Sequence, residues 1–242
     1  MSNAIVIIPT YNEKENVERM IRKVFSLGMT FHILIVDDNS PDGTRSIVKS
    51  LQQEFNQLFL LEREGKQGLG TAYIAGFKWC LQKEYEYIFE MDCDFSHNPE
   101  DLINLYQACV STPADMVIGS RYVNGVNVVN WPMSRVILSY YASMYVRIIT
   151  GMSIRDTTSG FACYNKKVLQ KLNLDAIKFK GYAFQIEMKF KTWRAGFKLK
   201  EVSIIFTDRQ EGQSKMSGGI IKEALFGVLE LKIKSLLGIL KI

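Results

Sequence analysis

Continuous apolar runs alternate with segments whose apolar residues recur at helical spacing along the first half of the chain. Strands are predicted at residues 4–8, 31–36, 58–61 and 116–119, and in a run that begins at Tyr87. The segments between them carry apolar residues three and four positions apart, which predicts helices. Runs that are apolar throughout are typical of parallel strands buried on both faces. The alternation therefore predicts an α/β fold with a Rossmann-like, doubly wound, mostly parallel sheet.

The second half of the chain is less regular. It predicts helices at residues 134–150 and 181–195, a strand at 199–206 and a helical tail at 218–242. The 134–150 and 218–242 segments are largely apolar with a thin charged or polar line, so both are predicted to be amphipathic. We expect one domain over residues 1–217, with halves of about 1–120 and 121–217, followed by the amphipathic tail.

Composition and charge narrow the class of protein. The 242 residues are 47% hydrophobic and 23% charged, which is ordinary for a globular domain. The net charge of +5 suits an anionic substrate or a membrane surface, but a solvated surface excess explains it equally. It does not single out nucleic acid, and none is expected as a partner. The four cysteines form no CxxC pair, so we expect them to be reduced. There is no room for a secretion signal, and no apolar run is long enough to span a bilayer, so we expect a cytoplasmic protein.

Acidic residues follow three of the predicted strands. Glu13 follows the first, Asp37 and Asp38 the second, and Asp92 and Asp94 the fourth. The carboxyl ends of parallel strands share one edge, where open α/β sheets bind ligands. Two carboxylates as close as Asp92 and Asp94 repel each other, and a hard divalent cation that also holds phosphates would compensate them. The alternative is that Asp94 only caps the next helix while Asp92 is solvated.

Glycine-rich phosphate loops are absent from the expected places. The first strand is followed by PTYNE rather than GxGxxG, and the sequence contains no GxxxxGK[ST]. Gly65, Gly68 and Gly70 follow the third strand at the wrong spacing and are predicted to make that loop flexible. A nucleotide would then be held by acids on its base and ribose and by a metal on its phosphates.

Nine motifs in order carry a family resemblance: IVIIPTYNEKEN, ILIVDDNSPDGT, GKQGLGTAYIAGF, MDCDFSHNPEDL, GSRY, NWPMSR, RDTTSGF, KGYAFQIEM and DRQEGQSKM. They span nearly the whole chain, which resembles the inverting family 2 glycosyltransferases of the A-type fold. Within that family it is similar to the polyprenyl-phosphate (dolichol-phosphate) mannose synthases. The resemblance implies a nucleotide-diphospho-sugar transferase that moves mannose from GDP-mannose to the phosphate of a polyprenyl phosphate. Inversion would give a β-linked mannosyl phosphate, with Mg²⁺ or Mn²⁺ as cofactor.

The resemblance also implies roles on the donor side, in the half at residues 1–120. The guanine and ribose pocket would be formed by Pro9, Tyr11, Glu13, Val36 and Asp38. The ribose and diphosphate would lie along Asp92, Cys93 and Asp94. The metal would be held by Asp94 with Ser96, and Cys93 is interpreted as filling space. His97 could neighbour the metal, although partial exposure near a helix start is the favoured interpretation.

Basic residues would complete the site. Lys180, Arg209 and Lys215 are implied to close over the donor diphosphate, and Arg121 and Arg135 to receive the acceptor phosphate, since Arg offers a fork of donors. Arg121 would also border the donor. Solvated surface charge is the alternative for all five. Asp156, with Ser159 and Gly160, would lie beneath the acceptor or only orient an arginine. Asp94, Arg121 and Arg135 are thus the predicted catalytic residues.

A lipid acceptor requires contact with a membrane. The 134–150 and 218–242 segments resemble interfacial helices, although burial against the domain or a partner is open. We expect peripheral association with the cytoplasmic face, with a small membrane subunit or a second copy of the chain as candidate partners. Two other functions stay open: a related transferase with a UDP-sugar donor, and a non-catalytic subunit that binds nucleotide sugars.

Overall fold

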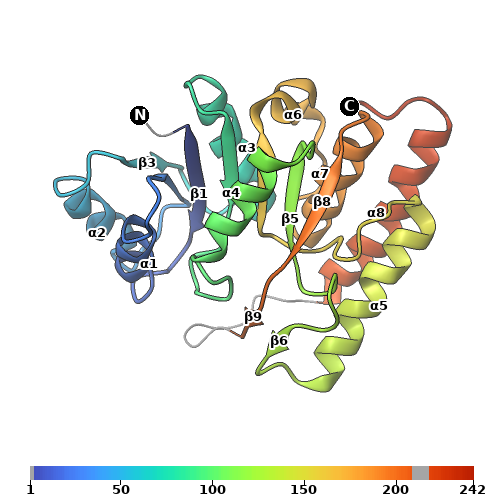
Figure 1. Ribbon diagram of the computed structural model, residues 1–242, viewed down its shortest axis with the longest axis horizontal. Coiled ribbons are helices and arrows are strands. Elements are labelled where there is room, and N and C mark those ends of the chain that lie inside the picture. The colour runs from blue at the N-terminus through green and yellow to red at the C-terminus, as the bar shows by residue number, and fades with distance from the viewer. Residues whose placement is uncertain (1–2, 209–217) are drawn as a thin grey trace.

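Seven strands form one mostly parallel sheet in the computed structural model, which describes residues 3–208 and 218–242 (Figure 1). The strands are β1 (Ala4–Thr10), β2 (His32–Asp37), β3 (Leu58–Glu62), β4 (Tyr87–Glu90), β5 (Met116–Ser120), β7 (Ala162–Asn165) and β8 (Leu199–Ser203). Their spatial order is β3-β2-β1-β4-β7-β5-β8, and β7 alone among them runs antiparallel to its neighbours. The predicted Rossmann-like, mostly parallel sheet is confirmed.

Helices cover both faces of this sheet, as expected for a doubly wound fold. One face is covered by α1 (Val17–Phe25), α2 (Thr44–Leu51) and α4 (Asp101–Ser111), and the other by α3 (Leu69–Leu81), α6 (Lys166–Lys171) and α7 (Tyr182–Arg194), with a short 3₁₀ turn at Leu174–Ala176. Strand side chains alternate between the two cores: Ile5 and Ile7 join the α3 side, while Val6 and Ile8 join the α1 side. Burial on both faces is why the strand reads as continuously apolar.

Two long helices, α5 (Met133–Thr150) and α8 (Gly218–Leu236), pack together beyond β8 (Figure 1). The Tyr145 hydroxyl donates a hydrogen bond to the Leu225 carbonyl at 2.9 Å, and Val146 and Val228 are buried in the core on the α3 side. Their outer sides are apolar and open, with Ile148 72% exposed. The tail helix ends at Leu236, so the prediction of helix through residue 242 is too long. Within the described residues, no helix combines the length and the apolar character needed to cross a bilayer.

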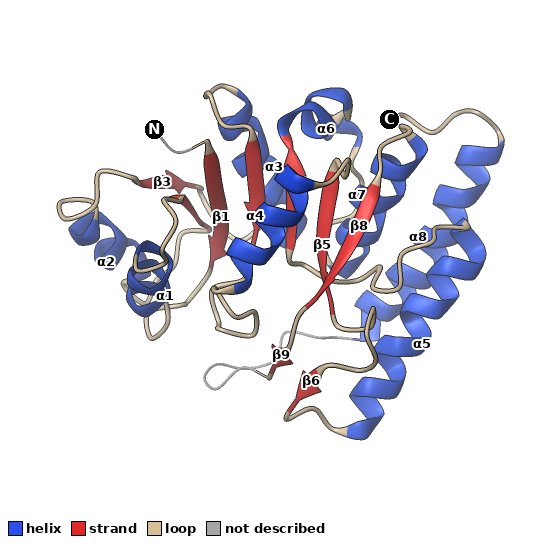
Figure 2. Cartoon of the chain, viewed as in Figure 1, coloured by secondary structure: helices blue, strands red, loops and turns tan. Residues whose placement is uncertain are grey.

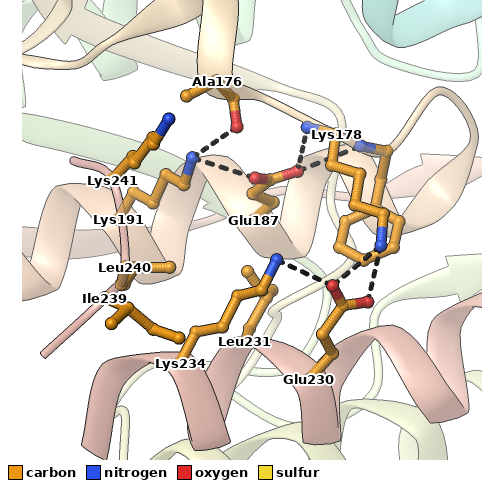
Figure 3. Close-up of a pocket in the computed structure, with 11 residues that line it drawn as sticks. Ala176, Lys178, Glu187, Lys191, Glu230, Leu231, Lys234, Ile239, Leu240 and Lys241 are labelled. Atoms are coloured by element: carbon orange, nitrogen blue, oxygen red, sulfur yellow. Dashed lines mark hydrogen bonds and ion pairs between the residues drawn. The ribbon is translucent and has the colours of Figure 1, made fainter. Parts of the chain in front are cut away.

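One ion pair also attaches α8 to the segment that precedes α7, beside a small cavity of about 120 Å³ (Figure 3). Glu230 of α8 accepts from Lys178 at 2.7 Å and from Lys234 at 2.8 Å. Beside them, Lys191 pairs with Glu187 at 3.0 Å, and both side chains are almost fully buried. Both acidic groups that line this cavity are therefore already engaged in ion pairs.

The predicted strand at 199–206 is wrong in its length. β8 ends at Ser203, Ile204 turns into the core, and Phe206–Thr207 form a separate short strand, β9. β9 pairs in parallel with β6 (Val128–Val129), as Figure 2 shows below the carboxyl ends of the large sheet. The break matters because it carries Phe206, Thr207 and Asp208 across those strand ends.

Gly68 and Gly70 after β3 serve close packing, which corrects the prediction of a flexible loop for these two, whereas Gly65 has open space around it. A Cβ on Gly70 would lie 2.8 Å from both the Phe179 carbonyl oxygen and the Phe184 ring. The Gly70 amide also donates to the Lys180 carbonyl at 2.8 Å. Gly68, two residues earlier, has φ +105°, which favours glycine. The start of α3 is thereby seated against the start of α7.

Candidate active site

The acid-bearing strand ends lie side by side at the carboxyl edge of the sheet. β1 pairs with both β2 and β4, and Thr10 is in register with Asp37. This is the arrangement expected from the sequence. The individual carboxylates differ, however, in what already surrounds them.

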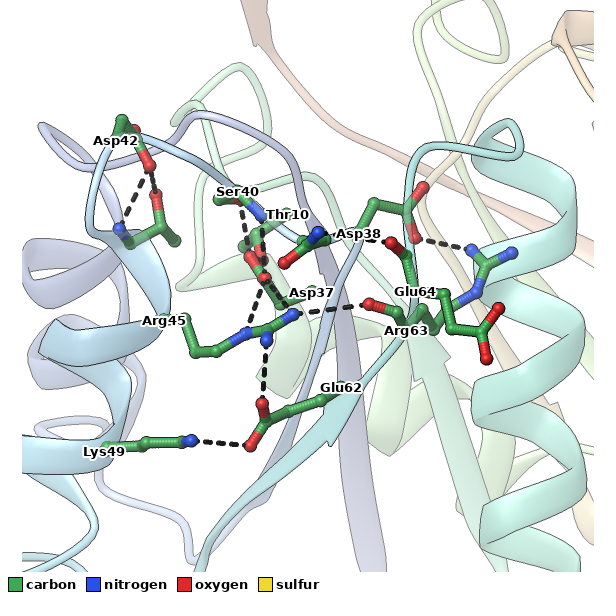
Figure 4. Close-up of polar contacts among 12 residues, drawn as sticks. Thr10, Asp37, Asp38, Ser40, Asp42, Arg45, Lys49, Glu62, Arg63 and Glu64 are labelled. Carbon is green, nitrogen blue, oxygen red and sulfur yellow. Dashed lines mark hydrogen bonds and ion pairs between the residues drawn. The ribbon is translucent and has the colours of Figure 1, made fainter.

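Asp37 is a structural residue within this edge. It is fully buried and accepts hydrogen bonds from Thr10 Oγ1 at 3.0 Å and from Ser40 Oγ at 2.6 Å (Figure 4). Arg45 Nη2 adds an ion pair at 3.2 Å. These contacts fix the turn after β2 and so position its neighbour Asp38.

Asp38 faces the loop after β3. Arg63 Nη1 donates to its Oδ1 at 2.6 Å, and the Gln67 amide lies 3.4 Å from Oδ2. Burial raises the pKa of the Asp38 carboxyl although Arg63 opposes it. Sequence reasoning missed Arg63, because nothing in a loop 25 residues away shows which carboxylate it will meet.

The other residues expected around the base lie on the same side. The Tyr11 ring is half-buried, with Lys66 Nζ 4.7 Å from its centroid. Glu13 Oε2 accepts from Asn16 Nδ2 at 3.1 Å, Pro9 is half-buried, and Val36 is buried in the sheet. Lys66 is a second cation here that the sequence did not indicate.

The turn after β4 carries Asp92, Cys93, Asp94 and Ser96. The Tyr73 hydroxyl donates to Asp92 Oδ1 at 3.5 Å, and the Ser96 amide donates to Asp94 Oδ1 at 3.1 Å. Between Asp94 and Ser96, Phe95 has φ +58°, a conformation that costs a bulky residue about 1–3 kcal/mol and is common at functional sites. Cys93 is buried in the apolar core on the α1 side.

The residues present fit a divalent cation bound together with a substrate. Ser96 Oγ is buried and finds no hydrogen-bond partner among the described residues, and it lies two positions from the Asp94 carboxylate. Across residues 3–208 and 218–242, no group of three or more acidic, histidine or cysteine side chains could hold a metal by itself. A cation held by one or two protein oxygens takes its other ligands from phosphate and water, as Mg²⁺ usually does.

His97 is only 2% exposed, so the favoured prediction of partial exposure is wrong. Its ring stacks on Phe161 with centroids 4.9 Å apart and meets Phe206 edge-on at 5.2 Å. Burial lowers the pKa of His97 to about 4, with Asp94 opposing and Arg121 adding to the shift. The imidazole is therefore neutral at ordinary pH and lies between the acids and the arginines.

Arg121 is held by a buried, bidentate ion pair with Asp156. Nε and Nη2 each donate to the carboxylate at 2.7 Å, and Nη2 also donates to Thr158 Oγ1 at 2.9 Å. Aromatic rings surround the guanidinium, with centroids 5.2–5.6 Å away, at Tyr122, Trp131 and Phe206. Asp156 thus orients Arg121, one of the two uses that the sequence left open for it.

Arg135 projects from the first turns of α5 toward the same rings. Its guanidinium lies 4.1 Å from the Trp131 centroid, and Nη1 donates to Asp208 Oδ1 at 2.8 Å. Trp131 therefore lies against both arginines, and cation–π attraction offsets part of the repulsion between them.

A cavity of about 410 Å³ joins these groups. Seven of the predicted site residues line it: Asp92, Asp94, Ser96, Arg121, Arg135, Ser159 and Gly160. The apolar part of its wall comes mainly from α5, with Leu138, Ala142, Tyr145 and Val146, and α8 adds Leu225. Charged side chains and apolar side chains therefore face the same cavity.

The remaining predicted residues lie elsewhere. Pro9, Tyr11, Glu13, Val36 and Asp38 sit at the neighbouring strand ends, outside the lining of this cavity. Lys180 is exposed, and its backbone anchors Gly70 at the start of α3. Arg209 and Lys215 lie outside the described residues.

A buried polar layer beneath the cavity was also missed. Gln185 Nε2 donates to Glu90 Oε2 at 2.9 Å, and Lys189 Nζ donates to Gln185 Oε1 at 3.0 Å and to the Ser159 carbonyl at 2.6 Å. Burial raises the pKa of Glu90 to about 7 and lowers that of Lys189 to about 8. The layer links the end of β4 to the Ser159–Gly160 turn, so it sets the distance between the two sides of the cavity.

Comparison with known proteins agrees with this geometry. Residues 5–172 match the family model described as glycosyl transferase family 2, and the chain belongs to that family. It is 47% identical over 234 residues to the polyprenol monophosphomannose synthase of Mycolicibacterium smegmatis, covering 95% of this chain and 87% of that protein. It is 46% identical over 224 residues to the undecaprenyl-phosphate mannosyltransferase of Micrococcus luteus, covering 93% and 91%.

The fold also matches solved structures at lower identity. One is a mannosyltransferase from Pyrobaculum calidifontis in complex with GDP-Man and Mn²⁺, with a TM-score of 0.59 and 15% identity over 98% of this chain and 74% of that one. At this identity the likeness concerns the fold alone. The A-type fold predicted from the motifs is thus the one that the chain adopts.

Proposed function

We propose that this protein transfers mannose from GDP-mannose to the phosphate of a polyprenyl phosphate, with inversion at the anomeric carbon. The observation that carries the proposal is the single cavity that joins Asp92 and Asp94 to Arg121 and Arg135 and continues into an apolar wall. The two sequence relatives, at 46–47% identity, are both named for mannosyl transfer to a polyprenyl carrier. The acceptor type and the sugar in the proposal come from that similarity.

Donor binding is assigned to the edge at β1, β2 and β4. Tyr11 would stack on the guanine, while Glu13 and Asp38 would accept hydrogen bonds from its ring and the ribose hydroxyls. Arg63 keeps the Asp38 carboxylate oriented at 2.6 Å. The remaining donor contacts in the proposal are Pro9, Val36, Asp92, Cys93, Lys180, Arg209 and Lys215.

Asp94 and Ser96 would hold Mg²⁺ or Mn²⁺, which would neutralise charge on the leaving diphosphate. The Ser96 hydroxyl is buried and has no hydrogen-bond partner in the described part of the chain, which supports this placement. Metal-dependent nucleotide binding and metal-dependent turnover would then both require Asp94 and Ser96, and each of the two can be measured by itself.

Arg121 and Arg135 would receive the acceptor phosphate and aim one of its oxygens at the anomeric carbon. That oxygen is already anionic at neutral pH, so the transfer needs positioning and charge neutralisation rather than a strong general base. Asp156 fixes Arg121 through two 2.7 Å hydrogen bonds, which limits its motion during the reaction. His97 lines the same cavity and would lie close to both substrates.

The lipid would leave the cavity along the apolar wall and enter a membrane next to α5 and α8. Large apolar side chains on these helices are more than 70% exposed at Met133, Ile148, Phe226 and Leu236. Such a face with Lys and Arg at its margins is typical of helices that lie in a membrane interface. We therefore propose peripheral contact with the cytoplasmic face of a membrane, with a membrane subunit or a second copy of the chain as further candidate partners.

Incubation with radiolabelled GDP-mannose, Mn²⁺ and a polyprenyl phosphate, followed by lipid extraction, tests the reaction. Label should enter the lipid phase with the wild type and not with Asp94→Ala. Thermal shifts with GDP and with UDP in the presence of Mn²⁺ test the donor. Tighter binding of UDP would overturn the mannose assignment, and unchanged turnover in Asp94→Ala would overturn the proposed metal site.

A further inference from the structure

The two arginines of the cavity are paired in different ways. Arg121 and Asp156 are 8% and 0% exposed, and the carboxylate takes two side-chain donors and the Arg121 amide at 3.0 Å. Arg135 and Asp208 are 23% and 29% exposed, and one contact of 2.8 Å joins them. The first pair is part of the fold, whereas the second can be exchanged at low cost.

Asp208 is held beside Arg135 through its backbone. Its amide donates to the Val129 carbonyl at 3.0 Å, which ties its backbone to the small β6–β9 sheet. The Arg135 guanidinium is fixed from the other side by the Trp131 ring at 4.1 Å. The carboxylate therefore meets an arginine that is already oriented toward the cavity.

We propose that Asp208 is a placeholder which the acceptor phosphate displaces from Arg135. The proposal rests on the proposed function, because it takes Arg135 as a ligand of the acceptor phosphate. No covalent bond changes: one anion replaces another on the same guanidinium.

Charge explains why the exchange favours a phosphate monoester. Arg121, Arg135, Asp156 and Asp208 together carry no net charge. An incoming anion is therefore attracted only weakly by the two arginines while Asp208 stays in place. A phosphate dianion brings more charge and more oxygens than a carboxylate, and matches the guanidinium fork in two-point contact. An unphosphorylated polyprenol brings no charge and leaves Asp208 on Arg135. Asp208 would thus make the site selective for phosphorylated lipid, as a specificity-determining residue.

The test varies a polyprenyl phosphate at saturating GDP-mannose and Mn²⁺ in the wild type and in Asp208→Asn. Loss of the competing charge should lower the KM for the acceptor about two- to fivefold, the equivalent of about 0.5–1 kcal/mol for a partly exposed ion pair. The KM for GDP-mannose should not change. Glu54→Gln, which removes one negative charge from an exposed pair with Arg22, is the matched control and should change neither KM. An acceptor KM that is unchanged or raised in Asp208→Asn would overturn the inference.

Arg135→Gln separates this inference from the proposed function. If Asp208 acts only through Arg135, adding Asp208→Asn to Arg135→Gln should leave the acceptor KM as it is in Arg135→Gln. The same decrease in both backgrounds would show that Asp208 acts elsewhere. A raised acceptor KM in Arg135→Gln with no effect of Asp208→Asn defeats the placeholder alone, whereas an Arg135→Gln variant with wild-type kinetics defeats the acceptor site itself.

Discussion

Replacing Asp156 with asparagine should lower the free energy of unfolding far more than replacing a partly exposed acid does. The substitution keeps the shape of the side chain and removes the charge that Arg121 contacts through two 2.7 Å hydrogen bonds. Burial by itself would raise the pKa of Asp156, but Arg121 outweighs it and the pKa stays below its ordinary value of 3.8. The carboxylate is therefore charged in the folded protein, and Asp156→Asn leaves a buried cation without its counterion.

The expected loss follows from burial. Removing one partner of a buried ion pair costs about 3–5 kcal/mol. In a chain of this length each kcal/mol lowers Tm by about 2–4 °C, so Asp156→Asn should lower Tm by roughly 6–20 °C. Asp208→Asn at the partly exposed Arg135 pair is the matched control. Asp208→Asn should lower the free energy of unfolding by no more than about 1 kcal/mol, and Tm by no more than about 4 °C.

Urea and thermal unfolding of both variants would measure the difference, with an unchanged m-value showing that the unfolded states are comparable. The pH dependence provides a second check. Because the pKa of Asp156 is depressed, its contribution is present above the unfolded value of 3.8 and is lost as pH falls through the folded pKa. The gap between wild type and Asp156→Asn should therefore shrink in acid. Losses of equal size in the two variants, or a gap that does not depend on pH, would refute the reasoning.

Three further outcomes are expected. Gly70→Ala should lower the free energy of unfolding in urea by about 1–3 kcal/mol, because its Cβ would lie 2.8 Å from a carbonyl oxygen and a phenylalanine ring. Gly28→Ala, whose Cβ would have nothing within 4 Å, is the control. Equal losses in the two variants would contradict the packing argument. Burial raises the pKa of Glu90 from 4.5 to about 7, so the contribution of Glu90 to stability is lost as pH rises across that window. Glu90→Gln should therefore make the free energy of unfolding less dependent on pH there. An unchanged slope would contradict the raised pKa. Ile148→Glu on the open side of α5 should weaken sedimentation with anionic vesicles relative to Val110→Glu on α4, where the apolar side chain is 51% exposed; equal binding of the two would argue against α5 as a membrane contact.

The candidate site was predictable wherever its residues follow a strand directly. Asp92 and Asp94 come within four residues of the end of β4, and Asp37 ends β2, so a parallel sheet must bring both to one edge. The family motifs then added roles that spacing alone does not carry. The long apolar helices were equally visible, because amphipathic character is a local property of the sequence.

Pairing between distant segments was not predictable. β7 enters the sheet antiparallel between β4 and β5, and the break after β8 depends on Phe206 finding a partner in β6. His97 was expected to be partly exposed, yet Phe161 and Phe206 enclose it. Each of these outcomes depends on residues tens of positions away.

The amino-acid sequence by itself determined which carboxylates stand at the ends of strands and which faces of the helices are apolar. Both are local properties: a strand appears as an apolar run with a visible end, and residues three and four positions apart share one face of a helix. Only the tertiary structure decided the partner of each charge: Arg63 for Asp38, Asp156 for Arg121 and Asp208 for Arg135. The physical reason is that an ion pair needs its two groups within a few ångströms and mostly out of water, and chain order does not say which segments will meet there.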